Sequence, residues 1–293
     1  MLTATSAFAQ STPELPRANV EIPALKTGGQ TTRVPAGGDL QKAIDAAKPG
    51  DRIELQPRAT YEGPFRLKVK DGDDWIVITT SGDLPKPGRH ILPSHAAAMP
   101  KLISAGDFVV ATDSGAHHYR FVGIEFAPKG GSFVSSLVQF GDKEAAADAL
   151  PHHLIVDRCY LHGDAKLGAR RGVALNGRDI AVVDSYFADF KEVGADSQAV
   201  SGWNGPGPIR IANNYLEAAG ENIMFGGADP KIADLVPSDI EIVHNHLSKP
   251  LRWRKGDPSF EGVEWSVKNL FELKNARRVL VNGNLLEYNW PQA

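Results

Sequence analysis

The segment IRIANNYL at residues 209–216 recurs with changes along much of the chain, and this repeat decides the fold. Its first, third and eighth positions are apolar or aromatic in every copy, and alternation at its start predicts a half-buried strand. The polar residues that follow predict a turn into a second short strand. The copies are YRFVGIEF (119–126), LIVDRCYL (154–161), IAVVDSYF (180–187), IRIANNYL (209–216), IEIVHNHL (240–247) and VLVNGNLL (279–286).

A second strand-like run lies between the copies of the repeat. Its members are LVQFG (137–141), GVALNG (172–177), QAVSGW (198–203), NIMFGG (222–227) and NLFELK (269–274). Each unit therefore offers about three short strands, and a unit this small buries its apolar face only by stacking on its neighbours. The pattern predicts an all-β protein, a right-handed parallel β-helix. Leucine-rich solenoids need a regular leucine spacing that is absent here, and β-sandwiches show hairpin turns instead of such a repeat.

The sixth position of the repeat ends in three asparagines, Asn214, Asn245 and Asn284. Side-chain amides at matching turns of stacked coils can hydrogen-bond to one another and to the turn backbone. We expect these asparagines to form such a ladder. Their predicted role is structural.

Residues 34–65 precede the repeat and read as a short helix followed by a strand. Asp39 is suited to the N-cap, and Pro49-Gly50 ends the helical pattern. One face of this helix is apolar, through Leu40, Ile44 and Ala47. The helix is expected to cap the open end of the coil stack, where strand edges would otherwise be exposed.

The same segment resembles the opening segment of pectin-lyase-like β-helix proteins, in which a helix and a PGD-I-L turn-strand lead into a Y-G-F coil. The resemblance extends over roughly residues 34–290 and implies a groove that takes acidic polysaccharide. NNYLEAAGEN (213–222) and HNHLSKPLRWRK (244–255) further resemble the calcium-binding and basic segments of the chondroitinase B and alginate lyase group. The acidic run E-I-I-S-K-S of that group is replaced here by NIMFGG.

Composition excludes several other classes of protein. The 293 residues carry 32 Lys and Arg against 35 Asp and Glu, a formal net charge of 32 − 35 = −3, whereas a nucleic-acid-binding domain usually shows a basic excess. No apolar run reaches 18 residues, so no membrane-spanning helix is expected. The single cysteine, Cys159, excludes an internal disulfide and a multi-cysteine zinc site.

The two ends suggest export and truncation. Residues 1–30 are interpreted as the remnant of a signal peptide, with Ala7-Phe8-Ala9 as its cleavage motif, followed by a tail; a disordered tail alone is the alternative. Residues 31–293 form the predicted β-helix domain, which stops without a polar cap and is expected to be truncated at its C-terminus. The full-length protein is expected to be a secreted or periplasmic monomer.

Basic and aromatic residues supply the candidates for catalysis and sugar binding. Uronate β-elimination needs a cation that neutralises the carboxylate and a base that removes the C5 proton. The expected catalytic residues are Arg252, Lys249 and Arg171, and the expected substrate-binding residues are Trp253, Trp203 and Arg254. The segment that carries most of them follows one coil as an insertion, and a solvated basic loop is the alternative interpretation.

Three carboxylates are the candidate metal ligands, namely Asp196, Glu221 and Glu217. They flank equivalent turns of neighbouring coils, so stacking should bring Asp196 and Glu221 close together. Such a pair suits Ca²⁺, or the acid and base of a glycoside hydrolase, although turn residues that simply face water have the same pattern.

The sequence thus leaves three functional hypotheses. The first is a lyase that cleaves uronate-containing polysaccharide by β-elimination. The second is a β-helix glycoside hydrolase with a carboxylate pair. The third is a non-catalytic β-helix that binds carbohydrate or has a structural role.

Overall fold

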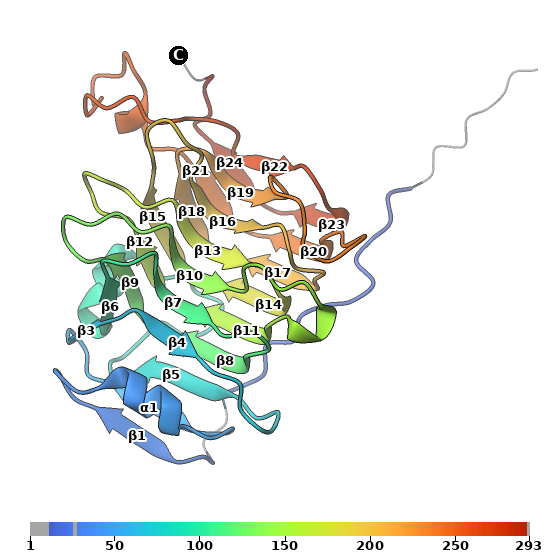
Figure 1. Cartoon of the computed structure of the whole chain (residues 1–293). Helices are drawn as coiled ribbons and strands as arrows, with labels where there is room; N and C mark the ends of the chain where they lie inside the picture. Colours follow the sequence, from blue (N-terminus) through green and yellow to red (C-terminus); the bar gives the residue numbers. More distant parts are fainter. Residues whose placement is uncertain (1–11, 26–27, 292–293) are drawn as a thin grey trace, which may run out of the picture.

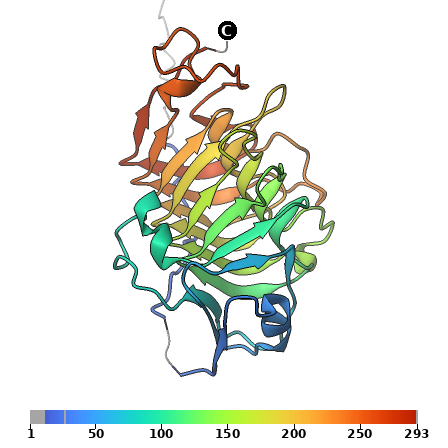
Figure 2. The same ribbon diagram turned by 90° about the vertical axis from the view of Figure 1, so that its left-hand side faces the viewer.

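The computed structural model describes residues 12–25 and 28–291, whose strands form three parallel sheets. The chain passes through sheets A, B and C in turn, so each full coil adds one strand to every sheet (Figures 1 and 2). All strand pairs within the sheets are between successive coils. The right-handed parallel β-helix that the repeat predicts is confirmed.

The strands are short in all three sheets. Sheet A contains β1 (Thr31–Val34), β2 (Arg52–Leu55), β5 (Ile76–Thr80), β8 (His117–Val122), β11 (His152–Asp157), β14 (Arg178–Val183), β17 (Ile209–Ala212), β20 (Ser238–Val243) and β23 (Arg277–Asn282). Sheet B contains β3 (Thr60–Glu62), β6 (Lys101–Ser104), β9 (Glu125–Pro128), β12 (Tyr160–His162), β15 (Tyr186–Phe190), β18 (Tyr215–Ala218), β21 (His246–Ser248) and β24 (Leu285–Glu287). Sheet C contains β4 (Phe65–Leu67), β7 (Phe108–Thr112), β10 (Ser136–Phe140), β13 (Arg171–Leu175), β16 (Gln198–Gly202), β19 (Glu221–Phe225) and β22 (Phe271–Leu273). Short 3₁₀ helices are η1 (Pro93–Ala98), η2 (Ala147–Ala149) and η3 (Leu251–Trp253).

Helix α1 (Leu40–Ala46) lies at the N-terminal end of the stack, near β1 (Figure 1). The Asp39 carboxylate accepts a hydrogen bond from the Lys42 backbone amide at 2.9 Å, as expected of an N-cap. Leu40 and Ile44 are buried in the main core. The predicted capping helix is confirmed.

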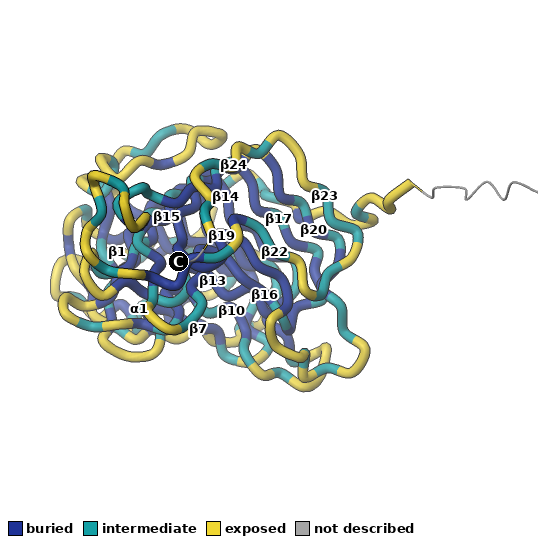
Figure 3. The backbone as a smooth tube through the Cα atoms, turned by 90° about the horizontal axis from the view of Figure 1, so that it is seen from above, coloured by how far each residue is buried: buried dark blue, intermediate teal, exposed yellow. Residues whose placement is uncertain are grey.

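Each copy of the repeat begins in sheet A, crosses a tight turn and ends in sheet B. In the copy at 209–216, Ile209 and Ile211 of β17 and Leu216 of β18 are at most 1% exposed. The second run lies in sheet C in every coil. Figure 3, seen from above, shows buried strands at the centre of the molecule and exposed segments concentrated in the loops around them.

The asparagine ladder is confirmed at the turn between sheets A and B. The Asn214 side-chain amide donates to Asn245 Oδ1 at 2.9 Å, and that of Asn245 donates to Asn284 Oδ1 at 3.0 Å. Asn245 Oδ1 also accepts the backbone N–H of Asn214, and its Nδ2 donates to the Ile211 carbonyl. The ladder therefore satisfies backbone groups that the turn would otherwise leave unpaired inside the protein.

The described part of the N-terminal tail packs on the outside of sheet A. Val20 is 8% exposed and contacts an apolar cluster on that sheet, and the Pro23 carbonyl accepts a hydrogen bond from buried Arg120. The proposed cleavage motif at residues 7–9 lies outside the described residues. At the other end, Leu285 and Leu286 of the last coil are about half exposed. In the part of the chain that the structure describes, no helix is long and apolar enough to cross a membrane.

Replacing Asn245 by Leu tests the ladder. The change removes the Oδ1 acceptor and the Nδ2 donor of Asn245 and leaves buried amide and carbonyl groups of the turn unpaired. We therefore expect a loss of about 3 kcal/mol in the free energy of unfolding. Urea denaturation measures it. Asn282→Leu, at an exposed position of β23, is the control, and an equal midpoint for the two variants would contradict a structural ladder.

Candidate functional site

The outer edge of sheet C carries a row of polar side chains at the start of three successive strands. Arg171, Gln198 and Glu221 are the first residues of β13, β16 and β19, and they stand in register. Arg171 Nε donates to Gln198 Oε1 at 3.1 Å, and Gln198 Nε2 donates to Glu221 Oε2 at 2.8 Å. Because the coils stack in register, the side chains at this position form a hydrogen-bonded row that runs from the Arg171 guanidinium to the Glu221 carboxylate.

A lysine from the last insertion completes this row. Lys268 Nζ lies 2.7 Å from Asp196 Oδ2 and 3.8 Å from Glu221 Oε1. Its backbone amide donates to the Ala219 carbonyl, which fixes the insertion against the turn before β19. We call these five residues the sheet C row: Arg171, Gln198, Glu221, Lys268 and Asp196.

Glu221 is the most unusual member of the sheet C row. Its side chain is fully buried, and its Oε1 atom has no hydrogen-bond partner in the structure. Burial raises the pKa of this carboxyl group, the Gln198 hydrogen bond opposes that effect, and the charge of Asp196 adds to it. A buried oxygen without a partner is costly, so it marks a place where a ligand atom would be stabilising.

Two further buried polar atoms without a hydrogen-bond partner belong to the same sheet. They are Ser201 Oγ in β16 and Asn176 Nδ2 directly after β13. Among the described residues, the fourth buried side-chain atom without a hydrogen-bond partner is Trp253 Nε1, besides these two and Glu221 Oε1. Unsatisfied polar atoms are therefore concentrated along sheet C.

An aromatic side chain stands beside the cationic end of the row. The Arg171 guanidinium lies 5.2 Å from the centre of the Trp203 ring, within the range of a cation–π contact. The Trp203 backbone amide donates to Asn176 Oδ1, which holds the turn that carries the ring. Burial lowers the pKa of Arg171, and the neighbouring Arg170 lowers it further.

Two residues predicted for the same site lie instead on the outside of sheet B. Arg252 Nη2 is 2.8 Å from Glu217 Oε1 and 3.1 Å from Asp189 Oδ1. Glu217 lies in β18, where its side chain is only 5% exposed. Burial raises the pKa of Glu217, whereas the Arg252 charge lowers it. Arg252, which the sequence analysis offered as a catalytic residue, is the counter-ion of a buried carboxylate in the structure.

Lys249 lies between the two faces with its ammonium group enclosed. Nζ donates to the carbonyl oxygens of Ala218, Ala219 and Gly220 and to Asn222 Oδ1, at 2.6–3.2 Å. Burial lowers its pKa to about 7, and Glu221 acts in the opposite direction. Lys249 is therefore placed to hold the turn between β18 and β19, and its ammonium faces no open surface.

The two predicted sugar-binding residues of the insertion, Trp253 and Arg254, also lie away from the sheet C row. Trp253 is 2% exposed and packs beside Lys191, Arg252 and Trp265, so its ring is not available for a sugar. Arg254 is exposed and lines a separate pocket together with Trp265. Neither residue reaches the sheet C row.

The three carboxylates predicted for calcium do not fit that ion. Glu217 is engaged with Arg252 on sheet B, and Lys268 lies within 4 Å of both Asp196 and Glu221. In the described ranges, neither group of three metal-binding side chains that lie close enough together includes any of these carboxylates. The positive charge next to Asp196 and Glu221 is instead provided by Lys268.

Sequence reasoning missed two members of the row. Gln198 opens the run QAVSGW and is the first residue of β16, and Lys268 immediately precedes the run NLFELK, so both lie where the chain enters sheet C. A search of that place in every coil would have found them.

Removing Arg252 tests whether its charge stabilises the buried Glu217 carboxylate on sheet B. In Arg252→Ala, Glu217 stays buried without its cation, so we expect a loss of about 1–3 kcal/mol in the free energy of unfolding. Arg254→Ala is the matched control and should change stability by less than about 0.5 kcal/mol. Equal denaturation midpoints for wild type and Arg252→Ala would remove Arg252 from this structural role.

Replacing Glu221 by Gln tests the buried charge. A carboxyl group whose pKa is raised by folding binds more protons in the native state, so wild-type stability falls as pH rises from about 4.5 through the folded pKa. Gln carries no charge at any pH. The variant should therefore gain melting temperature relative to wild type as pH rises through that window, and thermal unfolding from pH 4 to 8 measures the difference. The same pH trend in Glu62→Gln, an exposed position, would contradict this assignment.

Comparison with known proteins concerns the fold. No protein-family model and no curated protein matches the chain. Among solved structures, an alginate lyase from Paenibacillus sp. strain FPU-7 is 14% identical, with a TM-score of 0.44, over 88% of this chain and 98% of that one. The PL6-family alginate lyase AlyGC is 10% identical, with a TM-score of 0.35, over 97% of this chain and 42% of that one.

Pectate lyase Pel9A is 14% identical, with a TM-score of 0.36, over 89% of this chain and 80% of that one. At such identities and scores the likeness carries no residue correspondence. The fold is instead identified from the structure itself, in which the chain winds through three parallel sheets and begins with a capping helix. The chain has the pectin-lyase-like right-handed parallel β-helix fold.

Proposed function

We propose that the protein is a polysaccharide lyase that binds a uronate-containing chain across the sheet C row. The observation that carries this proposal is the row itself, in which two cations and two carboxylates stand within contact distance on neighbouring coils. A purely acidic face would repel an anionic sugar, and a purely basic face would offer no proton acceptor. Cations and carboxylates occur together on neighbouring coils, along the axis of the β-helix, which suits a polymer that lies along that axis.

Arg171 is the proposed partner of the substrate carboxylate. Its guanidinium lies beside Trp203, whose ring offers an apolar surface for a sugar face, and neutralising the uronate carboxylate acidifies the C5 proton. Among the described residues, Arg171 makes one side-chain hydrogen bond, to the neutral amide of Gln198, and no direct ion pair cancels its charge.

Glu221 is the proposed proton acceptor. Burial raises its pKa and leaves Oε1 without a hydrogen-bond donor, so the carboxylate is a stronger base than a solvated one. Lys268 contacts Oε1, and its side chain is 39% exposed, so it has room to move aside when the sugar binds. Electrons from the broken C5–H bond form the C4–C5 double bond as the C4–O bond breaks.

Lys268 is the proposed donor to the leaving oxygen. Asp196 raises its pKa through a hydrogen bond, so the ammonium form is present at neutral pH. The proton lost from C5 to Glu221 and the proton given by Lys268 to the O4 leaving group balance the elimination. Action on an external polysaccharide also agrees with a secreted or periplasmic location, which remains part of the proposal.

The decisive variant is Arg171→Ala. We expect kcat/KM on a cleaved uronan to fall by about 10²-fold, because a charge contact to the developing enolate is lost. Arg170→Ala is the matched control: it is the same residue type at the adjacent position, but its Nε and Nη2 atoms both donate to the Glu192 carboxylate at 2.6 Å. It should change kcat/KM by less than about threefold.

The assay is the ultraviolet absorbance of the unsaturated product, measured over a panel of alginate, polygalacturonate and glycosaminoglycans. New reducing ends without that absorbance would replace the lyase by a hydrolase. Retention on polysaccharide gels without any turnover would replace it by a carbohydrate-binding module. Equal activity of Arg171→Ala and wild type would remove the sheet C row from the mechanism.

A further inference from the structure

Two neighbouring strands of sheet A begin with a pair of histidines. They are His117-His118 at the start of β8 and His152-His153 at the start of β11, and His117 is in register with His152. No other strand of sheet A in the described residues begins in this way. The two pairs lie 35 residues apart, which is the step of the repeat between these two coils, so stacking brings four imidazoles together.

The backbone turns both histidines of each pair toward one another. Successive side chains of a regular strand point to opposite faces, but His118 and His153 have φ values of 57° and 53°, in the left-handed region. As a result, the Nδ1 atoms within each pair are 2.8 Å apart. Asp179 and Asp239 adopt the same conformation at the start of later strands, so the fold imposes this geometry and the sequence places histidines there in two coils only.

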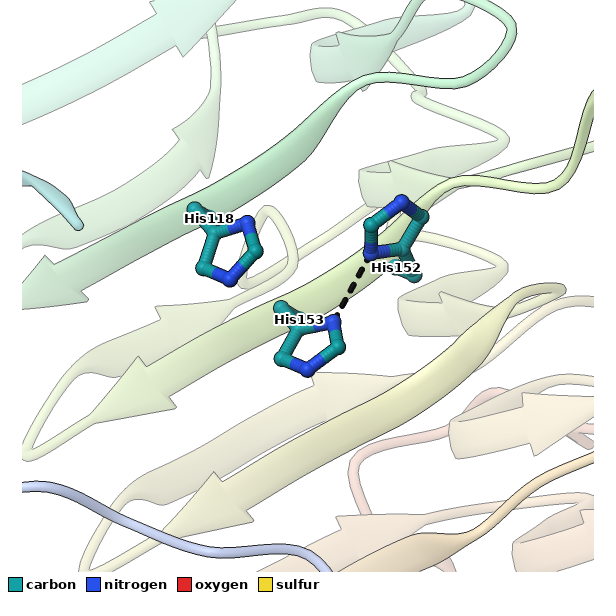
Figure 4. A group of neighbouring side chains, drawn as sticks. All are labelled: His118, His152 and His153. Atoms are coloured by element: carbon teal, nitrogen blue, oxygen red, sulfur yellow. Dashed lines mark hydrogen bonds between the residues drawn. The ribbon is translucent and has the colours of Figure 1, made fainter. Parts of the chain in front are cut away.

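The imidazoles of the two coils stack face to face. The ring centres of His118 and His153 are 4.4 Å apart, and those of His117 and His152 are 4.7 Å apart. Figure 4 shows His118 and His153 at matching places on adjacent strands, with His152 next to both. One ring nitrogen from each of these three histidines lies within 4.8 Å of the others. Ligand nitrogens of a tetrahedral Zn²⁺ are about 3.3 Å apart, given Zn–N bonds of about 2.0–2.1 Å, so small ring rotations would close the set.

The surroundings of the cluster suit a bound cation. Asp73 is exposed and lies close enough to His117 and His118 to act with them, and the Asp179 carboxylate is 3.8 Å from His153 Nδ1. The Trp75 ring packs edge-on against His118 and His153 and covers one side. The positive charge of Arg178 acts against a cation here, but Arg178 Nη1 lies 3.7 Å from Asp179 Oδ2.

Burial of the cluster also favours the neutral form of His118 and His152. Burial is the largest cause that lowers the pKa of His118 and of His152 to about 4; neighbouring imidazoles contribute at both residues, and Arg178 contributes at His152. Neutral imidazole is the form that ligates.

We propose that His118, His152 and His153 form a binding site for a divalent transition metal, with Zn²⁺ as the first candidate and the Asp73 and Asp179 carboxylates beside it. Imidazole ligands favour Zn²⁺, Ni²⁺ and Cu²⁺ over Ca²⁺ and Mg²⁺. Because its ligands come from β8 and β11, the ion would tie two successive coils together. This site is on sheet A, so it is independent of the proposed chemistry at the sheet C row.

Binding to the chelator-treated, full chain tests the site. Isothermal titration with Zn²⁺ should give one ion per chain, and Co²⁺ should give the visible absorption of a tetrahedral complex. His153→Ala should weaken Zn²⁺ binding by about 100-fold or more, since it removes one of three ligands. The matched control is the double variant His244→Ala/His246→Ala, which removes two histidines from one later coil and should bind like wild type.

Thermal unfolding gives a second measurement. Saturating Zn²⁺ should raise the melting temperature of wild type and of the control but not that of His153→Ala. His153 is chosen because its side chain is 39% exposed, so its loss leaves the core intact, whereas His118 is buried. Absence of stoichiometric Zn²⁺ binding to wild type would overturn the proposal. Equal loss of binding in His153→Ala and in the His244/His246 control would overturn it as well.

Discussion

In-register stacking of parallel coils is the constraint on which the rest of this structure depends. Adjacent strands lie about 4.8 Å apart, so a side chain at one position of a coil meets the side chain at the same position of the next coil. The asparagine ladder is one consequence, at the turn between sheets A and B. The stack of Tyr186 on Tyr215 outside sheet B, with ring centres 4.4 Å apart, is another. The histidine stack and the sheet C row follow the same rule.

Within one coil, the passage of the chain from one sheet to the next separates residues that are close in sequence. Glu217 and Glu221 are four positions apart, yet the first lies in a strand of sheet B and the second begins a strand of sheet C. The turn between them is held by Lys249, whose ammonium group takes three carbonyl oxygens of that turn. Two buried carboxylates thus face different sides of the β-helix, with Arg252 next to one and Lys268 near the other.

Much of this was predictable from the sequence, because strand period and repeat step report directly on stacking. Apolar alternation predicted about three strands in each coil and the apolar face of the capping helix. The asparagine that recurs at the sixth position of the repeat predicted the ladder. The stacking of coils also led to the expectation that Asp196 and Glu221 lie close together, and in the structure both lie within 4 Å of Lys268 Nζ.

The insertion after β21 was not predictable in this way. Residues 249–268 have no repeat partner, so their path depends on long-range contacts such as that of Arg252 with Asp189. Arg252, Lys249 and Trp253 therefore could be assigned to a coil but not to a face. The two His-His pairs did carry a signal, since they recur at the repeat step, but the left-handed backbone that makes them converge is not visible in the sequence.

The central claim is that the sheet C row binds a uronate chain, and a crystal structure of Glu221→Gln with a uronate oligosaccharide tests it most directly. The variant should retain the substrate uncleaved. The account predicts a sugar chain across β13, β16 and β19, with a carboxylate within hydrogen-bond distance of the Arg171 guanidinium. An oligosaccharide bound instead outside sheet B, beside Tyr186 and Arg252, with the sheet C row free, would contradict it.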